Sequence, residues 1–143
     1  MTQIDFYTQA EDKLHTACRL VAKALALGLK VTIFCPDREA ASRLDRLLWA
    51  VPATGFMPHC RPDDALAPLT PVLIDTTGDA RDHDEVLINL HTEWPVNFSR
   101  FQRLAEIVSS DDDDRAAARG RYKFYRDRGY AIRTHDLADR SPK

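Results

Sequence analysis

The chain has 143 residues, of which 44% are hydrophobic and 29% are charged, and its formal net charge is −2 at pH 7. This length and composition exclude disordered, fibrous and membrane-spanning proteins. The slightly acidic balance argues against a general nucleic-acid-binding protein, because such proteins need many cations to neutralise phosphates. We expect a single domain over residues 1–143, in which residues 139–143 form a frayed tail.

The cysteines and the N-terminus indicate a cytoplasmic protein. Cys18, Cys35 and Cys60 have no CxxC spacing, so they form neither a disulfide framework nor a zinc-binding pattern. The N-terminus lacks the basic region and the apolar stretch of a signal peptide. No apolar run reaches the roughly 20 residues that a membrane helix needs. We therefore expect reduced thiols, a cytoplasmic location and no contact with membranes.

The first part of the chain alternates between strand and helix patterns. Runs of β-branched and aromatic residues predict strands over residues 4–8 and 30–35. Apolar residues at helical spacing predict a helix over residues 11–27, which Gly28 ends, and a second helix that begins at Pro36-Asp37. This β-α-β-α order favours a parallel sheet.

The second part continues the alternation after a long connection that is interrupted by prolines. Apolar runs predict strands over residues 72–75, 86–90 and 104–108. The acidic run Asp111–Asp114 then begins a basic helix, and residues 131–134 form a weak last strand. Together these elements predict a three-layer α/β/α sandwich with a mainly parallel sheet.

The basic helix has two different faces. At about 100° per residue, one stripe spans roughly 100° of arc. The stripe consists of Arg115, Arg119, Tyr122, Lys123 and Arg126. The opposite side carries residues suited to packing, namely Ala117, Ala118, Phe124 and Tyr125. The stripe is either a receptor for an anion or a solvated charged face, and the tyrosine within it favours the receptor.

A second candidate surface lies at the end of the second helix and in the connection that follows it. Trp49, Phe56 and Met57 place large apolar side chains where full burial is difficult, and such residues are typical interface anchors. Alternatively, Trp49 covers the core and Phe56 packs beneath its own loop. The connection itself is expected at the surface, with a short extended piece near Phe56 and Met57.

Other candidate sites lack the required spacing. Parallel sheets bind nucleotides at the carboxyl ends of their strands, but the loops at residues 8–12 and 35–38 lack the glycines of a phosphate loop. We expect no cofactor. Asp111–Asp114 and Asp82-His83-Asp84 are interpreted as capping and solvated loop charge rather than metal sites. His59-Cys60 is not a nucleophile pair, because adjacent residues rarely face each other. No catalytic residue is predicted.

Several short motifs follow one another in a characteristic order between the first strand and the end of the basic helix. They are Phe6-Tyr7, Arg43-Leu-Asp45, Leu48-Trp49-Ala, Pro52, Phe56-x-Pro58-His59, Val86-Leu-Ile-Asn-Leu90 and Arg119-x-Arg121-Tyr122-Lys123-x-Tyr125-Arg126. In this order and spacing, the chain resembles the chi subunit of bacterial DNA polymerase III.

The resemblance implies a non-catalytic accessory protein of the clamp-loader assembly. Members of that family bridge the psi subunit to the acidic C-terminal tail of single-stranded DNA-binding protein, so contact with nucleic acid is mainly indirect. The family's tail-binding positions correspond to Arg115, Arg119, Tyr122 and Lys123. The psi-binding surface corresponds to the segment that holds Trp49 and Phe56.

Two features differ from the family pattern. The chain ends in a polar segment, residues 135–143, where the family has a short apolar end. This difference leaves open whether the last predicted strand forms. Gly120 lies inside the basic helix and is expected to weaken it by roughly 1 kcal/mol relative to alanine.

Two functions from other classes remain as alternatives. A binding module for single-stranded nucleic acid would stack bases on Tyr122 and Tyr125. A degenerate nucleotide-binding enzyme would need a ligand at Asp5, Thr8 or Asp75.

Overall fold

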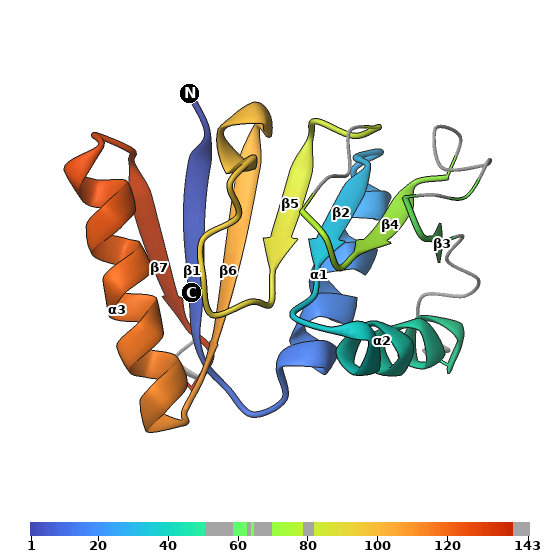
Figure 1. Ribbon diagram of the computed structural model, residues 1–143, viewed down its shortest axis with the longest axis horizontal. Coiled ribbons are helices and arrows are strands. Elements are labelled where there is room, and N and C mark those ends of the chain that lie inside the picture. Colours follow the sequence, from blue (N-terminus) through green and yellow to red (C-terminus); the bar gives the residue numbers. More distant parts are fainter. Residues whose placement is uncertain (51–58, 63, 65–69, 79–81, 139–143) are drawn as a thin grey trace.

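The computed structural model describes residues 1–50, 59–62, 64, 70–78 and 82–138. Its centre is a seven-stranded sheet in the order β3-β4-β2-β5-β6-β1-β7, in which all neighbouring strands run parallel (Figure 1). The strands are β1 (Gln3–Ala10), β2 (Val31–Phe34), β3 (His59–Cys60), β4 (Val72–Asp75), β5 (Val86–Asn89), β6 (Arg103–Ser109) and β7 (Ile132–Asp136). The helices are α1 (Lys13–Ala26), α2 (Arg38–Ala50) and α3 (Asp112–Asp127), with a short 3-10 turn at Phe98–Arg100.

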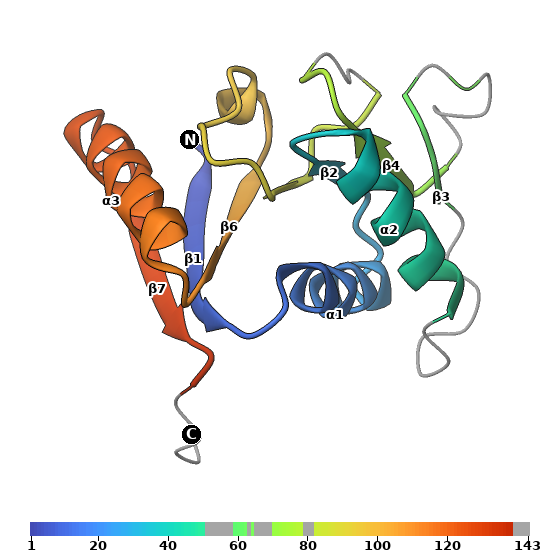
Figure 2. The ribbon, with the colours of Figure 1, turned by 60° about the horizontal axis from the view of Figure 1, so that its bottom comes forward.

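Helices cover both faces of the sheet, which confirms the predicted α/β sandwich. Figure 2 shows α3 beside β1 and β7, and α1 and α2 toward the other end of the sheet. The side chains of β6 alternate between the layers. Ala105 and Ile107 belong to the cluster that contains the buried residues of α1 and α2, whereas Leu104 and Val108 pack with the buried residues of α3.

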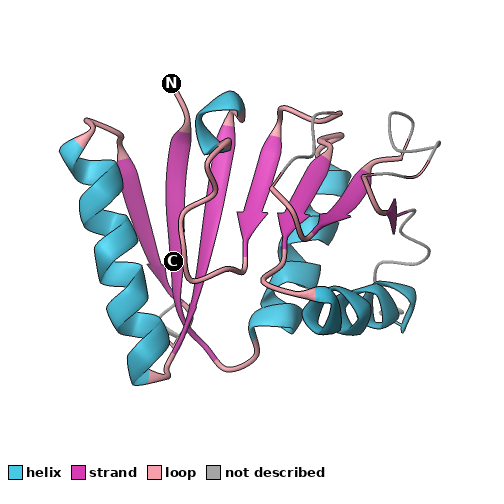
Figure 3. Cartoon of the chain, viewed as in Figure 1, coloured by secondary structure: helices cyan, strands magenta, loops and turns pink. Residues whose placement is uncertain are grey.

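The helices begin where the sequence places hydrogen-bonding side chains, and Figure 3 shows their alternation with the strands. The Asp12 carboxylate accepts hydrogen bonds from the backbone N–H groups of Leu14 and His15 at the start of α1. Asp37 does the same for Ala40 in α2, and Asp111 for Asp114 in α3. Within the described ranges, no helix combines the length and the apolar composition needed to cross a membrane.

The boundaries differ from the predictions mainly near the C-terminus. The predicted last strand, residues 131–134, is the edge strand β7, which continues to Asp136. It pairs with β1, where Tyr7 lies opposite His135 and their rings stack. The polar residues His135 and Asp136 therefore extend the strand instead of ending it, because an edge strand tolerates polar side chains. The expected extended piece near Phe56 and Met57, and the expected frayed tail, lie outside the described residues.

Candidate functional site

All five residues of the stripe on α3 are exposed. Tyr122 keeps 37% of its surface accessible, and Arg119 and Lys123 are exposed beside it. Arg115 forms an ion pair with Asp112 at 3.8 Å and Arg126 one with Asp127 at 3.5 Å, but these pairs lie in solvent. Such exposed pairs contribute little energy, so the cations are available to a partner.

The opposite side of α3 packs as the sequence predicts. Ala118 and Tyr125 are buried, and Phe124 is half-buried. The Phe124 ring stacks on Trp94 with 3.7 Å between centroids, and the Arg128 guanidinium lies 3.6 Å from the same ring centroid. Because Tyr125 has no exposed surface, the alternative in which bases stack on both Tyr122 and Tyr125 is wrong for Tyr125.

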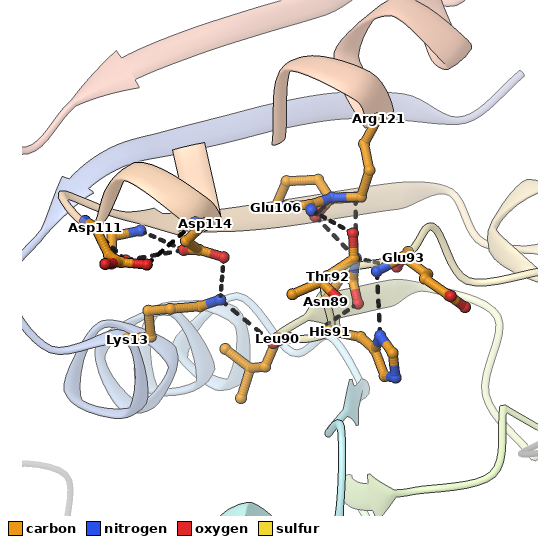
Figure 4. A network of polar contacts seen from close by, with 11 residues as sticks. Lys13, Asn89, Leu90, His91, Thr92, Glu93, Glu106, Asp111, Asp114 and Arg121 are labelled. Carbon is orange, nitrogen blue, oxygen red and sulfur yellow. Dashed lines mark hydrogen bonds and ion pairs between the residues drawn. The ribbon is translucent and has the colours of Figure 1, made fainter. Parts of the chain in front are cut away.

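Arg121 is the arginine of α3 that points into the protein. Its Nε donates to Glu106 of β6 at 3.0 Å, and its Nη1 donates to the Thr92 carbonyl at 2.7 Å (Figure 4). Asn89 and the Tyr125 hydroxyl also donate to the Glu106 carboxylate. Burial raises the pKa of Glu106, while the Arg121 charge and these hydrogen bonds oppose the rise. This network attaches α3 to the sheet and sets which face it exposes.

The acidic run before the stripe does not form a uniformly solvated loop. Asp111 caps α3, but Asp114 turns inward, which corrects the interpretation of its charge as solvated. Its carboxylate accepts hydrogen bonds from the backbone and hydroxyl of Ser109 and pairs with Lys13 at 3.2 Å (Figure 4). Burial alone would raise the pKa of Asp114, but the Ser109 hydrogen bonds and the Lys13 charge lower it below its usual value. Lys13 also donates to the Leu90 carbonyl, so α1, α3 and the end of β5 meet here.

A cavity of about 320 Å³ adjoins the stripe at the carboxyl ends of β1 and β6. Three stripe residues, Arg115, Arg119 and Tyr122, line its α3 side. The other walls come from strands β1, β6 and β7, namely Phe6, Thr8, Gln9, Val108, Ser109 and Thr134, with Ala118 of α3. The cavity therefore combines guanidinium groups with apolar walls, and Lys123 and Arg126 lie outside its lining.

A bulge in β1 shapes one wall of this cavity. The register between β1 and β6 shifts between Tyr7 and Ala10, where β1 holds one more residue than its partner strand. Gln9 takes a positive φ of 61° at this point. This is an uncommon conformation for a residue other than glycine, and bulges of this kind often lie next to binding sites.

Trp49 forms a second exposed feature, at the end of α2. It is 58% exposed, so the alternative in which it covers the core is wrong. His59 of β3 packs against it edge-on, with 5.0 Å between ring centroids. Phe56 and Met57, the other predicted residues of this surface, lie outside the described residues.

The remaining candidates have structural roles or lie apart. The His83 ring contacts Thr32 and the Thr70 carbonyl inside the protein. Among the residues that the structure describes, no group of three or more His, Cys, Asp or Glu side chains is arranged to hold a metal ion. Asp5, Thr8 and Asp75 are not brought together, because β1 and β4 are separated by three strands. Asp5 instead bonds Arg133 and His135.

Sequence patterns alone do not reveal the strand walls of the cavity or the partners of Arg121. Phe6, Val108 and Thr134 come from three strands that are far apart along the chain. One signal was present: Glu106 is a charged residue at the centre of an apolar strand run, and such a residue requires a buried partner.

Comparison with known proteins supports the family resemblance that the motifs indicate. Residues 1–133 match the family described as DNA polymerase III chi subunit, HolC. The chain is 38% identical over 142 residues to DNA polymerase III subunit chi of Pseudomonas aeruginosa, covering 96% of this chain and 98% of that protein. It is 33% identical over 121 residues to the Escherichia coli subunit, covering 82% and 80% of the two chains. It is 32% identical over 122 residues to that of Haemophilus influenzae, covering 85% of each. The chain therefore belongs to the family of the DNA polymerase III chi subunit.

Proposed function

We propose that this protein bridges the psi subunit of DNA polymerase III to the acidic C-terminal tail of single-stranded DNA-binding protein. Its family makes it an accessory subunit in DNA replication rather than an enzyme. The observation that carries the proposal is the cavity beside the α3 stripe, which joins two arginines and a tyrosine to apolar walls. In this role the protein works in the cytoplasm and meets DNA mainly through its partner.

The tail needs both charged and apolar contacts. An exposed ion pair contributes about 0.2–1 kcal/mol, so the four cations of the stripe supply at most about 4 kcal/mol. Charge alone would then give millimolar binding, whereas a micromolar complex needs about 8 kcal/mol. Burying a large apolar side chain adds about 1.5–3 kcal/mol, and the cavity volume of about 320 Å³ lies within the range of ligand pockets.

Each residue of the stripe receives a role in this proposal. Arg119 binds the terminal carboxylate, because its planar guanidinium can donate two parallel hydrogen bonds. The terminal aromatic side chain enters the cavity, where Tyr122 and Phe6 form an aromatic wall with 5.5 Å between their ring centroids. Arg115, Lys123 and Arg126 attract the acidic side chains that precede the terminus.

The psi subunit binds Trp49, and Phe56 and Met57 are the other residues proposed to contact it. Trp49 is an exposed aromatic of the kind that anchors interfaces. It belongs to α2, next to β3 at one edge of the sheet, whereas α3 packs near β1 and β7 at the other edge (Figure 2). This separation allows both partners to bind at once.

Titration with a synthetic acidic peptide that ends in an aromatic residue tests the tail site. Arg119→Ala and Tyr122→Ala are expected to weaken peptide binding about 10-fold or more, the equivalent of about 1.4 kcal/mol. Tyr122→Phe keeps the ring and retains most of the affinity. Arg19→Ala changes an exposed arginine on α1 away from this cavity and serves as the matched control.

The same series separates the alternatives. Blocking the peptide carboxyl group as an amide removes the contribution assigned to Arg119, so the amide peptide binds the parent and Arg119→Ala proteins alike. Unchanged peptide affinity in both the Arg119→Ala and Tyr122→Ala proteins would overturn the tail site. Tight binding of a single-stranded oligonucleotide, lost on Tyr122→Ala, would favour the direct nucleic-acid alternative.

A further inference from the structure

Three residues from two elements meet around the exposed tryptophan of α2. Asp45 and Trp49 are four positions apart on the helix, so their side chains lie on the same side. His59 comes from β3, the strand at the edge of the sheet that pairs with β4. These elements are separated in the chain by the connection after α2, and the contacts of His59 bring them together.

His59 contacts both of the other side chains. Its Nε2 lies 2.9 Å from Oδ1 of Asp45, and its ring meets that of Trp49 at 5.0 Å and 62°, an edge-to-face arrangement. The His59 side chain has no exposed area, whereas 45% of the Asp45 side chain is exposed. The imidazole is therefore buried, whereas its partner Asp45 reaches the surface.

Trp49 is 58% exposed, so a partner can reach its indole while the indole packs on His59. The His59 ring supplies a fixed surface on one side, and the Asp45 carboxylate fixes the His59 ring in turn. The pairing of His59 with Val72 fixes the backbone that carries it. An interface anchor that is ordered before binding loses less side-chain freedom when the partner arrives.

We propose that His59 is a positioning residue for the partner surface, which holds the Trp49 indole in the orientation that the psi subunit binds. This inference rests on the proposed function, because that function assigns Trp49 to the psi subunit. Asp45 acts through His59. Loss of the His59 ring is expected to weaken psi binding about 2- to 10-fold, the ordering cost of one side chain expressed as affinity.

The test follows Trp49 directly. The chain has two tryptophans, so Trp94→Phe leaves Trp49 as the sole emitter. In that background, His59→Gln keeps a hydrogen-bonding group near Asp45 but removes the ring that packs on Trp49. The steady-state anisotropy of Trp49 emission is expected to fall and its quenching by acrylamide to rise, and affinity for purified psi subunit falls 2- to 10-fold. Affinity for the acidic peptide stays unchanged and verifies the fold.

Asp45→Asn is the second variant, because it alters an accessible side chain and endangers the fold less. It is expected to change Trp49 anisotropy and psi affinity in the same direction as His59→Gln, and by less. Full psi affinity in Trp49→Ala would overturn the proposed psi surface itself. If Trp49→Ala weakens psi binding while His59→Gln and Asp45→Asn leave anisotropy and affinity unchanged, the positioning role is wrong. Weaker psi binding with unchanged Trp49 anisotropy in both variants also contradicts it.

Discussion

Arg121 of α3 and Glu106 of β6 form an ion pair of 3.0 Å in which the two side chains are 2% and 0% exposed. This pair explains how a helix rich in arginine presents one face outward and attaches by another. Its guanidinium points to Glu106 in the sheet (Figure 4). The exposed stripe occupies the opposite flank of the helix. The buried pair therefore orients the proposed tail-binding surface.

Arg121→Ala is expected to destabilise the protein by about 3–5 kcal/mol, because it leaves the Glu106 carboxylate buried without its counter-charge. Urea unfolding followed by circular dichroism measures the change. Arg119→Ala removes an exposed arginine two positions earlier in the chain and is expected to change stability by no more than about 0.5 kcal/mol. Equal losses in the two variants would show that the buried pair is not important for stability.

Asp114→Asn is expected to destabilise the protein at neutral pH by about 1–3 kcal/mol, through the charged hydrogen bonds with Ser109 and Lys13. The folded-state pKa of Asp114 is lowered, so its stabilisation is complete above the unfolded pKa of about 3.9 and is lost as pH falls through the folded pKa. The difference between parent and variant in free energy of unfolding is therefore constant near pH 7 and shrinks below about pH 4.

Asp113→Asn is the control for this pH dependence, because Asp113 occupies the same helical turn and is exposed. At pH 7, Asp113→Asn is expected to lower the free energy of unfolding by less than Asp114→Asn does. A difference for Asp114→Asn that grew toward acid pH would contradict the lowered pKa.

Gly120→Ala is expected to stabilise the protein by up to about 1 kcal/mol, since alanine favours the helix over glycine. Gly120 lies within α3, and an added Cβ would meet no atom within 4 Å. Gly28→Ala is the contrasting change: the space there is also open, but φ is +76°, which strains an L-residue. The melting temperature should rise for Gly120→Ala and fall for Gly28→Ala. A lower melting temperature for Gly120→Ala would show that the glycine has a packing role.

Salt is expected to separate the two proposed interfaces. Raising the ionic strength from 0.1 to 1 M shortens the screening length from about 10 to 3 Å, which weakens contacts between exposed charges. The acidic peptide complex should therefore lose much of its affinity, while the psi complex, anchored by Trp49, should change little. Calorimetric titrations over a sodium chloride series measure both. Parallel losses in the two complexes would contradict an apolar psi surface.

Local patterns were sufficient to predict most of the fold and the composition of the stripe. The β-branched run at residues 30–35 became β2, and the spacing of Arg115, Arg119 and Tyr122 placed them on one exposed face. Both follow from the side-chain period of a strand or a helix, which depends on neighbouring residues alone. The family resemblance rests likewise on short motifs, and the comparisons confirm it.

The contacts that complete each surface needed the folded chain. Lys13 pairs with Asp114, which is 101 positions away in the chain. Arg121 of a helix binds Glu106 of the sheet, and the walls of the cavity come from three strands. The energies of such pairs come from burial and from distances between segments remote in the chain. The period of a helix predicts which residues lie on the same face. The order of the strands and the packing of the layers determine which face is exposed to solvent and which residues contact the other face.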